Sequence, residues 1–346
     1  MRKGTKILVT GGTGFIGSHT VVELAAAGYQ PVLMDNFSNS GPEVLEGIER
    51  ILGFRPAFYK SDCQSAEAFR EIFRAEKEIE GVIHFAAFKA VGESVQFPLK
   101  YYRNNIDSLL SLLEAASDAG VKDLVFSSSC TVYGEPETLP VDETFPILPA
   151  QSPYGNSKQI CEEILRDSVA AGMGFRVLSL RYFNPIGAHP SAEIGELPIG
   201  VPGNLVPFVV QTAAGWREQL SVFGNDYNTP DGTCIRDYIH VVDLAKAHVK
   251  AIGFLSACTE ICLYDWVNLG TGNGSSVLEV INAFEKVSHQ KLNHRMAARR
   301  SGDVEKIYAS TEKAKQVLGW QTELSLETAL EDAWRWQQKQ GSAPGK

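Results

Sequence analysis

The chain has 346 residues, of which 44% are hydrophobic and 21% charged, a composition typical of folded globular proteins and unlike that of disordered or fibrous chains. At about 150 residues per domain this length predicts two domains or one large one, with a core that needs no disulfide or structural metal. The 41 acidic and 32 basic residues leave a net charge of −9, which disfavours nucleic-acid binding but still allows arginines to bind a small anion.

The apolar segments and the cysteines of the sequence bear on the compartment in which the protein works. No stretch approaches the roughly 18 apolar residues of a membrane span, and the basic N-terminus leads into only three apolar residues, too few for a signal peptide. Six cysteines are scattered singly, and the close pair Cys258 and Cys262 lacks the second pair that a zinc site requires. We therefore predict reduced thiols, no metal site, no membrane association and a cytoplasmic location.

Short apolar runs alternate with helical patterns through the first half of the chain. Strands that are apolar throughout and separated by helices predict a parallel sheet covered on both faces, which is an α/β, Rossmann-like doubly wound fold. The predicted strands are 6–10, 31–35, 57–60, 81–85, 123–127 and 176–181, and the predicted helices include 43–52, 67–76, 102–119 and 153–171.

The second half has a different texture. Residues 184–235 are rich in Pro, Gly and Asn and are too long for a connector, so we expect them to cover a ligand. A helix at 241–252 and a strand at 266–269 are predicted to return to the sheet, and helices at 277–287, 310–318 and 325–338 to form a smaller domain. The expected organisation is a Rossmann domain at 1–183 with a returning segment at about 236–270, a smaller C-terminal domain at 184–235 and 271–340, and a tail at 341–346.

A glycine motif follows the first predicted strand. Gly12, Gly14 and Gly17 fit G-x-G-x-x-G, in which glycine allows a tight turn and lets a pyrophosphate approach the backbone at a helix N-terminus. The second strand ends at Asp35, whose carboxylate would accept hydrogen bonds from the ribose of NAD and repel the 2′-phosphate of NADP. The motif therefore predicts NAD. A second glycine cluster at 270–274 has another spacing and is interpreted as a loop.

A second motif combines a tyrosine and a lysine on one helix. Ser152 is a suitable N-cap, so Tyr154 and Lys158 are expected one turn apart on the same face, where the lysine should lower the pKa of the phenol. With 11 tyrosines in the chain this spacing can arise by chance, so its position matters. The helix follows the fifth predicted strand, which ends in three serines at 127–129. We predict a Ser–Tyr–Lys catalytic site at the carboxyl ends of the strands.

At these residues the chain resembles the UDP-glucose 4-epimerases, a family of the extended short-chain dehydrogenases/reductases, over nearly its whole length. The segments that carry the resemblance are TGGTGFIGSH (10–19), VIHFAAFKAVGES (82–94), FSSSCTVYG (126–134), SPYGNSK (152–158), RYFNPIGAHPS (181–191), FGNDY (223–227) and RDYIHVVDLA (236–245).

The resemblance implies an isomerase of galactose metabolism that interconverts UDP-galactose and UDP-glucose. NAD stays bound, oxidises the sugar at its 4-position and returns the hydride to the opposite face after the 4-keto sugar has rotated. Tyr154 takes the proton of the 4-hydroxyl, Ser129 hydrogen-bonds the reacting oxygen, and Lys158 binds the nicotinamide ribose. NAD binding is assigned to the Rossmann domain and UDP-sugar binding to the smaller one. The helices at 102–119 and 153–171 are expected to form a homodimer.

The resemblance also implies two sets of binding residues, each of which includes Ser129 and Tyr154. The remaining cofactor residues are Gly11, Gly12, Gly14, Phe15, Ile16, Gly17, Asp35, Asn36, Asp62, Cys63, Phe85, Ala86, Lys89, Asn104, Lys158 and Phe183. The remaining substrate residues are Asn184, Asn204, Leu205, Phe223, Arg236, Arg300, Asp303 and Ile307. Without the resemblance, the arginines could equally be solvated, Phe223 could belong to the core, and the asparagines could be turn residues.

Ile307 stands where related enzymes carry a gatekeeper. A bulky Tyr there restricts the enzyme to UDP-glucose and UDP-galactose, whereas a small residue admits N-acetylated sugars. Ile is intermediate in size and has no hydroxyl. We expect non-acetylated substrates, with N-acetylhexosamines as the open alternative.

Two other activities are compatible with the fold. Nucleotide-sugar 4,6-dehydratases carry Asp-Glu after the strand-end serine or threonine, and UDP-glucuronate decarboxylases carry a Glu in this region. This chain has Cys130-Thr131 there, with no carboxylate, so both activities are disfavoured. A non-catalytic NAD-binding regulator would typically have lost the Tyr or the Lys. Both are present, so an enzyme is expected.

Overall fold

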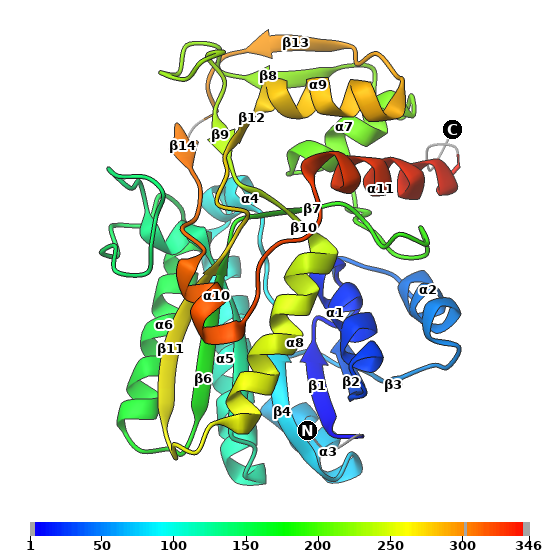
Figure 1. The fold of residues 1–346 in the computed structure, drawn as a ribbon. Coiled ribbons are helices and arrows are strands. Elements are labelled where there is room, and N and C mark those ends of the chain that lie inside the picture. Colours follow the sequence, from blue (N-terminus) through cyan, green and yellow to red (C-terminus); the bar gives the residue numbers. More distant parts are fainter. Residues whose placement is uncertain (1–3, 301–302, 342–346) are drawn as a thin grey trace.

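The computed structural model describes residues 4–300 and 303–341 (Figure 1). Residues 1–3 of the basic N-terminus, Ser301 and Gly302, and residues 342–346 of the expected tail lie outside the described residues. Within the described ranges, no helix is long and apolar enough to cross a membrane.

A parallel sheet forms the centre of the fold, with strand order β11-β6-β5-β4-β1-β2-β3. Its strands are β1 (Lys6–Thr10), β2 (Gln30–Asp35), β3 (Ala57–Lys60), β4 (Ile79–His84), β5 (Asp123–Ser129), β6 (Arg176–Tyr182) and β11 (Leu263–Leu269). Strand order reverses between β1 and β4, and in such sheets ligands bind at the carboxyl ends beside the reversal. The predicted doubly wound fold is confirmed.

Helices cover both faces of the sheet (Figure 1). Along β1, Ile7 and Val9 face one apolar layer and Leu8 faces the other, which explains why the strand is apolar throughout. The first layer contains α1 (Phe15–Ala26), α2 (Glu43–Leu52), α8 (Val241–Ala257) and α10 (Glu312–Leu318). The second contains α3 (Ala66–Ala75), α5 (Pro98–Ala119) and α6 (Pro153–Ala170), and α4 (Val91–Gln96) contacts α5 and α6.

The predicted strands and helices are confirmed, with shifts at their ends. The helix expected at 102–119 begins at Pro98, since proline is well suited to the first helical position. Strand β5 continues to Ser129, so all three serines lie in the sheet. Helix α10, which the sequence analysis grouped with the smaller domain, packs against α8 and β11 because Ala314 and Leu318 join the apolar layer there.

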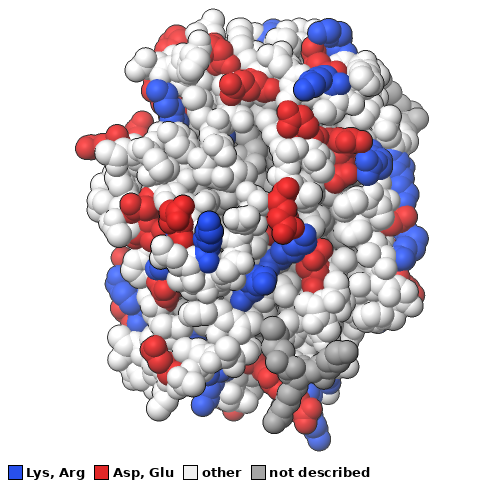
Figure 2. Space-filling view, in the orientation of Figure 1, with Lys and Arg blue, Asp and Glu red and all other residues white. Residues whose placement is uncertain are grey.

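The remaining elements lie above the carboxyl ends of the parallel strands in Figure 1. They enclose a separate core to which Val209, Val280, Phe284 and Leu330 contribute. These elements are β7 (Asn184–Ile186), α7 (Leu205–Ala213), β8 (Leu220–Phe223), β9 (Ile235–Arg236), β10 (Tyr238–His240), β12 (Ser275–Ser276), α9 (Val277–Ser288), β13 (His294–Ala297), β14 (Lys306–Ile307) and α11 (Leu326–Lys339). On the face shown in Figure 2, acidic and basic side chains are interspersed.

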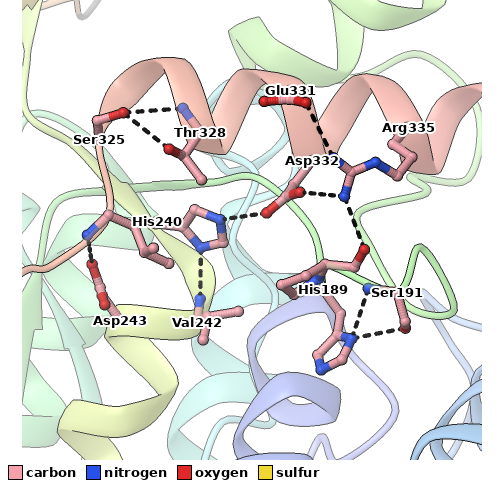
Figure 3. A network of polar contacts seen from close by, with 12 residues as sticks. His189, Ser191, His240, Val242, Asp243, Ser325, Thr328, Glu331, Asp332 and Arg335 are labelled. Carbon is pink, nitrogen blue, oxygen red and sulfur yellow. Dashed lines mark hydrogen bonds and ion pairs between the residues drawn. The ribbon is translucent and has the colours of Figure 1, made fainter.

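Helix α11 is fastened to the start of α8 by buried polar contacts (Figure 3). The ring of His240 accepts a hydrogen bond from Val242 N at Nδ1, so its proton lies on Nε2 and is donated to Asp332 Oδ2 at 3.2 Å. The other carboxylate oxygen of Asp332 accepts from Arg335 Nη1 at 2.9 Å. These bonds hold the upper elements against the sheet layer.

Candidate active site

The glycine turn after β1 forms a tight cradle at the N-terminus of α1. Gly11 has φ +66°, and a Cβ there would lie 2.9 Å from Ala86 N. A Cβ on Gly17 would lie 2.1 Å from Gly11 O, so only glycine lets α1 pack this closely on the turn. The N-cap of α1 is Gly14, which carries no side chain to cover the first-turn amides. This geometry suits a dinucleotide pyrophosphate.

A carboxylate is held beside this turn. Asp35, at the end of β2 and 8% exposed, accepts hydrogen bonds from Thr13 N at 3.1 Å and Phe37 N at 2.9 Å. Next to it, Asn36 Nδ2 donates to Asp62 Oδ2 at 3.0 Å. A fixed negative charge here fits a ribose that carries free hydroxyls and opposes a 2′-phosphate. The residues present therefore fit NAD.

The loop after β4 connects this turn to the helices of the second layer. Phe85 N donates to Thr10 O at 3.1 Å, so the loop starts beside the glycine turn. Asn104 Nδ2 donates to its neighbour Asn105 Oδ1 at 3.0 Å. The sequence analysis missed Asn105, which is buried and whose Nδ2 contacts Phe88 O and Ser157 Oγ. An asparagine inside the helix predicted at 102–119 was the signal that the sequence offered, and its burial was not evident there.

The structure brings Ser129, Tyr154 and Lys158 together at the carboxyl end of β5. Ser152 caps α6 by accepting from Gly155 N at 3.1 Å, which starts the helix just before Tyr154. Lys158 Nζ lies 6.0 Å from the centroid of the Tyr154 ring and donates to Ser127 O at 2.7 Å. The hydroxyl of Ser129 hydrogen-bonds the Tyr154 phenol. This arrangement of a hydroxyl, a phenol and an ammonium group can carry out acid–base chemistry.

The protonation equilibria of this cluster differ from the expectation. Burial raises the pKa of Tyr154 to about 12, and the hydrogen bond from Ser129 opposes this only in part. Burial also lowers the pKa of Lys158 to about 8, although the negative charge of Glu162 nearby acts in the opposite direction. In the protein chain alone, burial therefore outweighs any lowering of the phenol pKa by Lys158. The cost of burying a phenolate dominates, and the ammonium group is bonded to the Ser127 carbonyl.

A buried ion pair, missed by the sequence analysis, fixes α6 behind these groups. Glu162, one turn after Lys158, accepts from Arg181 Nε at 2.9 Å and Nη2 at 2.5 Å, and from Ser128 Oγ at 2.5 Å. It thereby joins α6 to β5 and β6. The spacing of Tyr154, Lys158 and Glu162 at every fourth residue was the signal that could have revealed it.

The residues assigned to the diphosphate and base also meet. Arg236 in β9 is paired with Ile307 in β14, and its Nη2 lies 3.7 Å from Asp303 Oδ1. Arg300 Nη2 contacts the same oxygen at 2.8 Å, and its guanidinium lies 5.9 Å from the centroid of the Phe223 ring. The structure therefore places Asp303 between the two arginines.

Glu196, which the sequence analysis did not single out, connects the two predicted sets. Its Oε1 accepts from Lys89 Nζ at 3.1 Å and from Asn204 Nδ2 at 3.0 Å, so a residue assigned to the cofactor and one assigned to the substrate share one carboxylate. Asn204 is the N-cap of α7, which begins at Leu205. The other assigned positions lie nearby in the fold: Asn184 begins β7, Phe183 packs in the same small apolar cluster as Ile307, and Cys63 is buried after β3.

The doubly wound sheet, the glycine turn and the Ser129–Tyr154–Lys158 cluster define a short-chain dehydrogenase/reductase. A family model described as GDP-mannose 4,6 dehydratase matches residues 8–333. The UDP-glucose 4-epimerase of Bacillus subtilis (strain 168) is 55% identical over 331 residues, which is 96% of each chain.

Solved structures agree with these matches. The UDP-glucose 4-epimerase of Stenotrophomonas maltophila with bound NAD and formylated UDP-arabinopyranose matches with a TM-score of 0.93 and 45% identity, covering 97% of this chain and 98% of that one. The enzyme of Bifidobacterium longum in complex with NAD+ and UDP matches with the same TM-score, identity and coverage. The chain belongs to the UDP-glucose 4-epimerase family, within the wider family that the dehydratase model describes.

Proposed function

We propose that this chain interconverts UDP-galactose and UDP-glucose by oxidation at the sugar 4-position, rotation of the 4-keto sugar and reduction from the opposite face. When bound, NAD would supply the hydride acceptor and donor for this chemistry and the positive charge of its oxidised ring, and the glycine turn and Asp35 would hold it. The observation that carries the proposal is the Ser129–Tyr154–Lys158 cluster at the carboxyl end of a sheet whose first turn fits a dinucleotide.

In the proposed reaction Tyr154 takes the proton of the sugar 4-hydroxyl and returns it when the keto group is reduced. A phenol with a pKa of about 12 is almost entirely protonated at neutral pH and so cannot accept a proton. Positive charge near it is required to stabilise the phenolate, which is the form that acts as the base. Lys158 contributes one such charge while it is protonated, and Ser129 hydrogen-bonds the reacting oxygen. The buried Glu162–Arg181 pair holds α6, and with it both side chains, in place.

The arginines of the upper elements are proposed to bind the diphosphate of the UDP-sugar. Arg236 and Arg300 both lie against Asp303, and Phe223, beside Arg300, is 41% exposed and free to stack on uracil. A diphosphate brings more charge than one carboxylate and suits a pair of guanidinium groups.

Proton NMR of the purified protein with UDP-galactose, without added cofactor, tests this function. We expect the UDP-glucose signal to grow to equilibrium, which also shows that NAD was retained during purification. Absence of conversion, even after NAD is supplied, contradicts the proposal. An NAD-binding regulator would give that result.

The substrate range is proposed to depend on Ile307, which is 5% exposed and packs with Phe183. We propose that its volume disfavours an N-acetyl group. UDP-N-acetylgalactosamine should be epimerised more slowly than UDP-galactose, and Ile307→Ala should narrow the difference. An equal rate for both substrates in the unaltered protein would overturn this assignment.

We also propose the domain division at 1–183 with 236–270 for NAD and 184–235 with 271–340 for the UDP-sugar, the segment around α10 remaining with the sheet. A cytoplasmic homodimer is proposed as well. The six cysteines are unpaired, and α5 carries the exposed apolar side chains Leu99 and Leu110. Light scattering after size exclusion should give twice the chain mass of 37.8 kDa, and a Leu110→Glu variant should shift it toward one chain.

A further inference from the structure

The carboxylate of Asp237, a residue between β9 and β10, accepts hydrogen bonds from four donors. It is fully buried. Oδ1 accepts from Thr271 N at 2.8 Å and from Thr271 Oγ1 at 2.7 Å, and Oδ2 accepts from Gly272 N and Ala309 N, both at 3.2 Å. A Cβ on Gly270 would lie 2.4 Å from Oδ2, so glycine is needed there for the loop to approach.

These bonds join the segments that carry two proposed substrate residues, and the backbone of Asp237 contacts a third. Arg236 precedes Asp237 directly and is paired with Ile307, two residues before the donor Ala309. The backbone carbonyl of Asp237 accepts from Asn184 N at 2.9 Å. The strands involved have only two or three residues each, so their own ladder bonds are few. The Asp237 side chain therefore adds hydrogen bonds between segments that the few ladder bonds of these short strands would hold only weakly.

We infer that Asp237 is a positioning residue for UDP-sugar binding, whose carboxylate fixes the spacing of Arg236 and Ile307 without touching the substrate. The inference rests on the proposed function. We call the bonds from the Asp237 carboxylate to Thr271, Gly272 and Ala309 the Asp237 clamp. The acid–base groups lie on β5 and α6, so loss of this clamp should weaken substrate binding and leave the rate of the chemical step unchanged.

Asp243 provides a matched control six residues further along the same segment. Asp243, which is labelled in Figure 3, is also fully buried. Its Oδ2 accepts from Glu323 N at 2.9 Å and Leu324 N at 2.8 Å. Those donors belong to the chain just before α11 and fasten it to α8. The Oδ1 atom of Asp243 has no hydrogen-bond partner among the described residues, so an asparagine there can keep both bonds at its carbonyl oxygen and turn its NH2 group to the unbonded side. This change should leave the β9 and β14 strands in position.

The test compares Asp237→Asn with Asp243→Asn. Asparagine keeps the size of the side chain and turns one acceptor into an NH2 group that faces N–H donors. Melting temperature, kcat and KM for UDP-galactose, and the Kd of UDP by calorimetry are measured for both variants and the unaltered protein. We expect Asp237→Asn to melt earlier and to raise KM and Kd by about tenfold at nearly unchanged kcat, and Asp243→Asn to leave KM and Kd unchanged.

An unchanged KM and Kd in Asp237→Asn, or an equal rise in Asp243→Asn, overturns the inference. If Asp237→Asn does not fold, Thr271→Val tests the same clamp because it removes one donor of the four. A rise in KM at constant kcat then supports the inference, and an unchanged KM overturns it. UDP calorimetry separates this test from the proposed function, which fails when the unaltered protein binds UDP but converts no UDP-galactose.

Discussion

The two walls of the proposed site are built in different ways. The acid–base wall stands on β5, a strand of seven residues, and α6, a helix of 18, whose backbone bonds are continuous. The substrate wall stands on β9 and β14, each of two residues, held by the buried carboxylate of Asp237. From this difference we expect chemistry and affinity to depend on separate parts of the structure: changes to the acid–base wall should lower kcat, and changes to the substrate wall should raise KM.

The sharpest way to break this division is to remove the phenol hydroxyl. We expect Tyr154→Phe to lower kcat by about a thousandfold, since general acid–base catalysis contributes 10²–10⁴ and the variant has no group to exchange the proton. NAD content, measured after denaturation, should be unchanged. The control is Tyr102→Phe in α5, which removes the phenol oxygen that accepts a 2.8 Å hydrogen bond from Asn156 of α6. Its kcat should remain within a few-fold of that of the unaltered protein. Substantial turnover in Tyr154→Phe would contradict the assignment.

Rigidity of the acid–base wall should depend on its buried ion pair. Glu162→Gln leaves the Arg181 guanidinium buried without a counter-charge, and we expect the free energy of unfolding to fall by about 3 kcal/mol or more. Urea titration measures this. In Lys246→Gln, which removes an exposed pair with Glu323 at 3.2 Å, the loss should stay below about 1 kcal/mol. Equal losses would show that the pair does not hold α6.

On the substrate wall, Arg236→Gln should raise KM for UDP-galactose by about ten- to a hundredfold while kcat stays within a few-fold, because a charge-assisted bond to phosphate is lost. Arg295→Gln, on the exposed strand β13, serves as the control and should leave KM within about twofold. Steady-state kinetics of both variants decides the matter. A fall in kcat alone for Arg236→Gln would place this residue with the chemistry.

The smallest expected effect is a pH dependence from Lys158. Its ammonium group is present below a pKa of about 8 and is lost as the pH rises through that value, which removes positive charge near Tyr154. We expect kcat to fall several-fold on this alkaline limb, at about pH 8 or somewhat lower when further positive charge is bound nearby. Lys158→Arg keeps its charge across this range and should lack the limb. Persistence of the same limb in that variant would rule out Lys158 as its source.

Much of the fold and the acid–base cluster could be predicted from the sequence. The alternation of apolar runs with helical segments predicted the parallel sheet, since both faces of each strand are buried. Tyr154 and Lys158 share a helix face by spacing alone, and β5 brings its serines to the same sheet edge. The pKa of Tyr154 could not be predicted in this way, because it depends on burial by residues distant in sequence.

The hydrogen bonds of Asp237 and Glu196 could not be predicted from the sequence for a related reason. Asp237 binds donors at 271, 272 and 309, Glu196 binds Lys89 and Asn204, and each pairing spans a separation that no local pattern encodes. By itself the sequence determined the local properties of this protein: its helices and strands, the glycine turn and the spacing of Tyr154 and Lys158, all set by interactions within a few residues. Only the tertiary structure decided which carboxylates are buried against which donors, because burial and pairing arise when distant segments pack together.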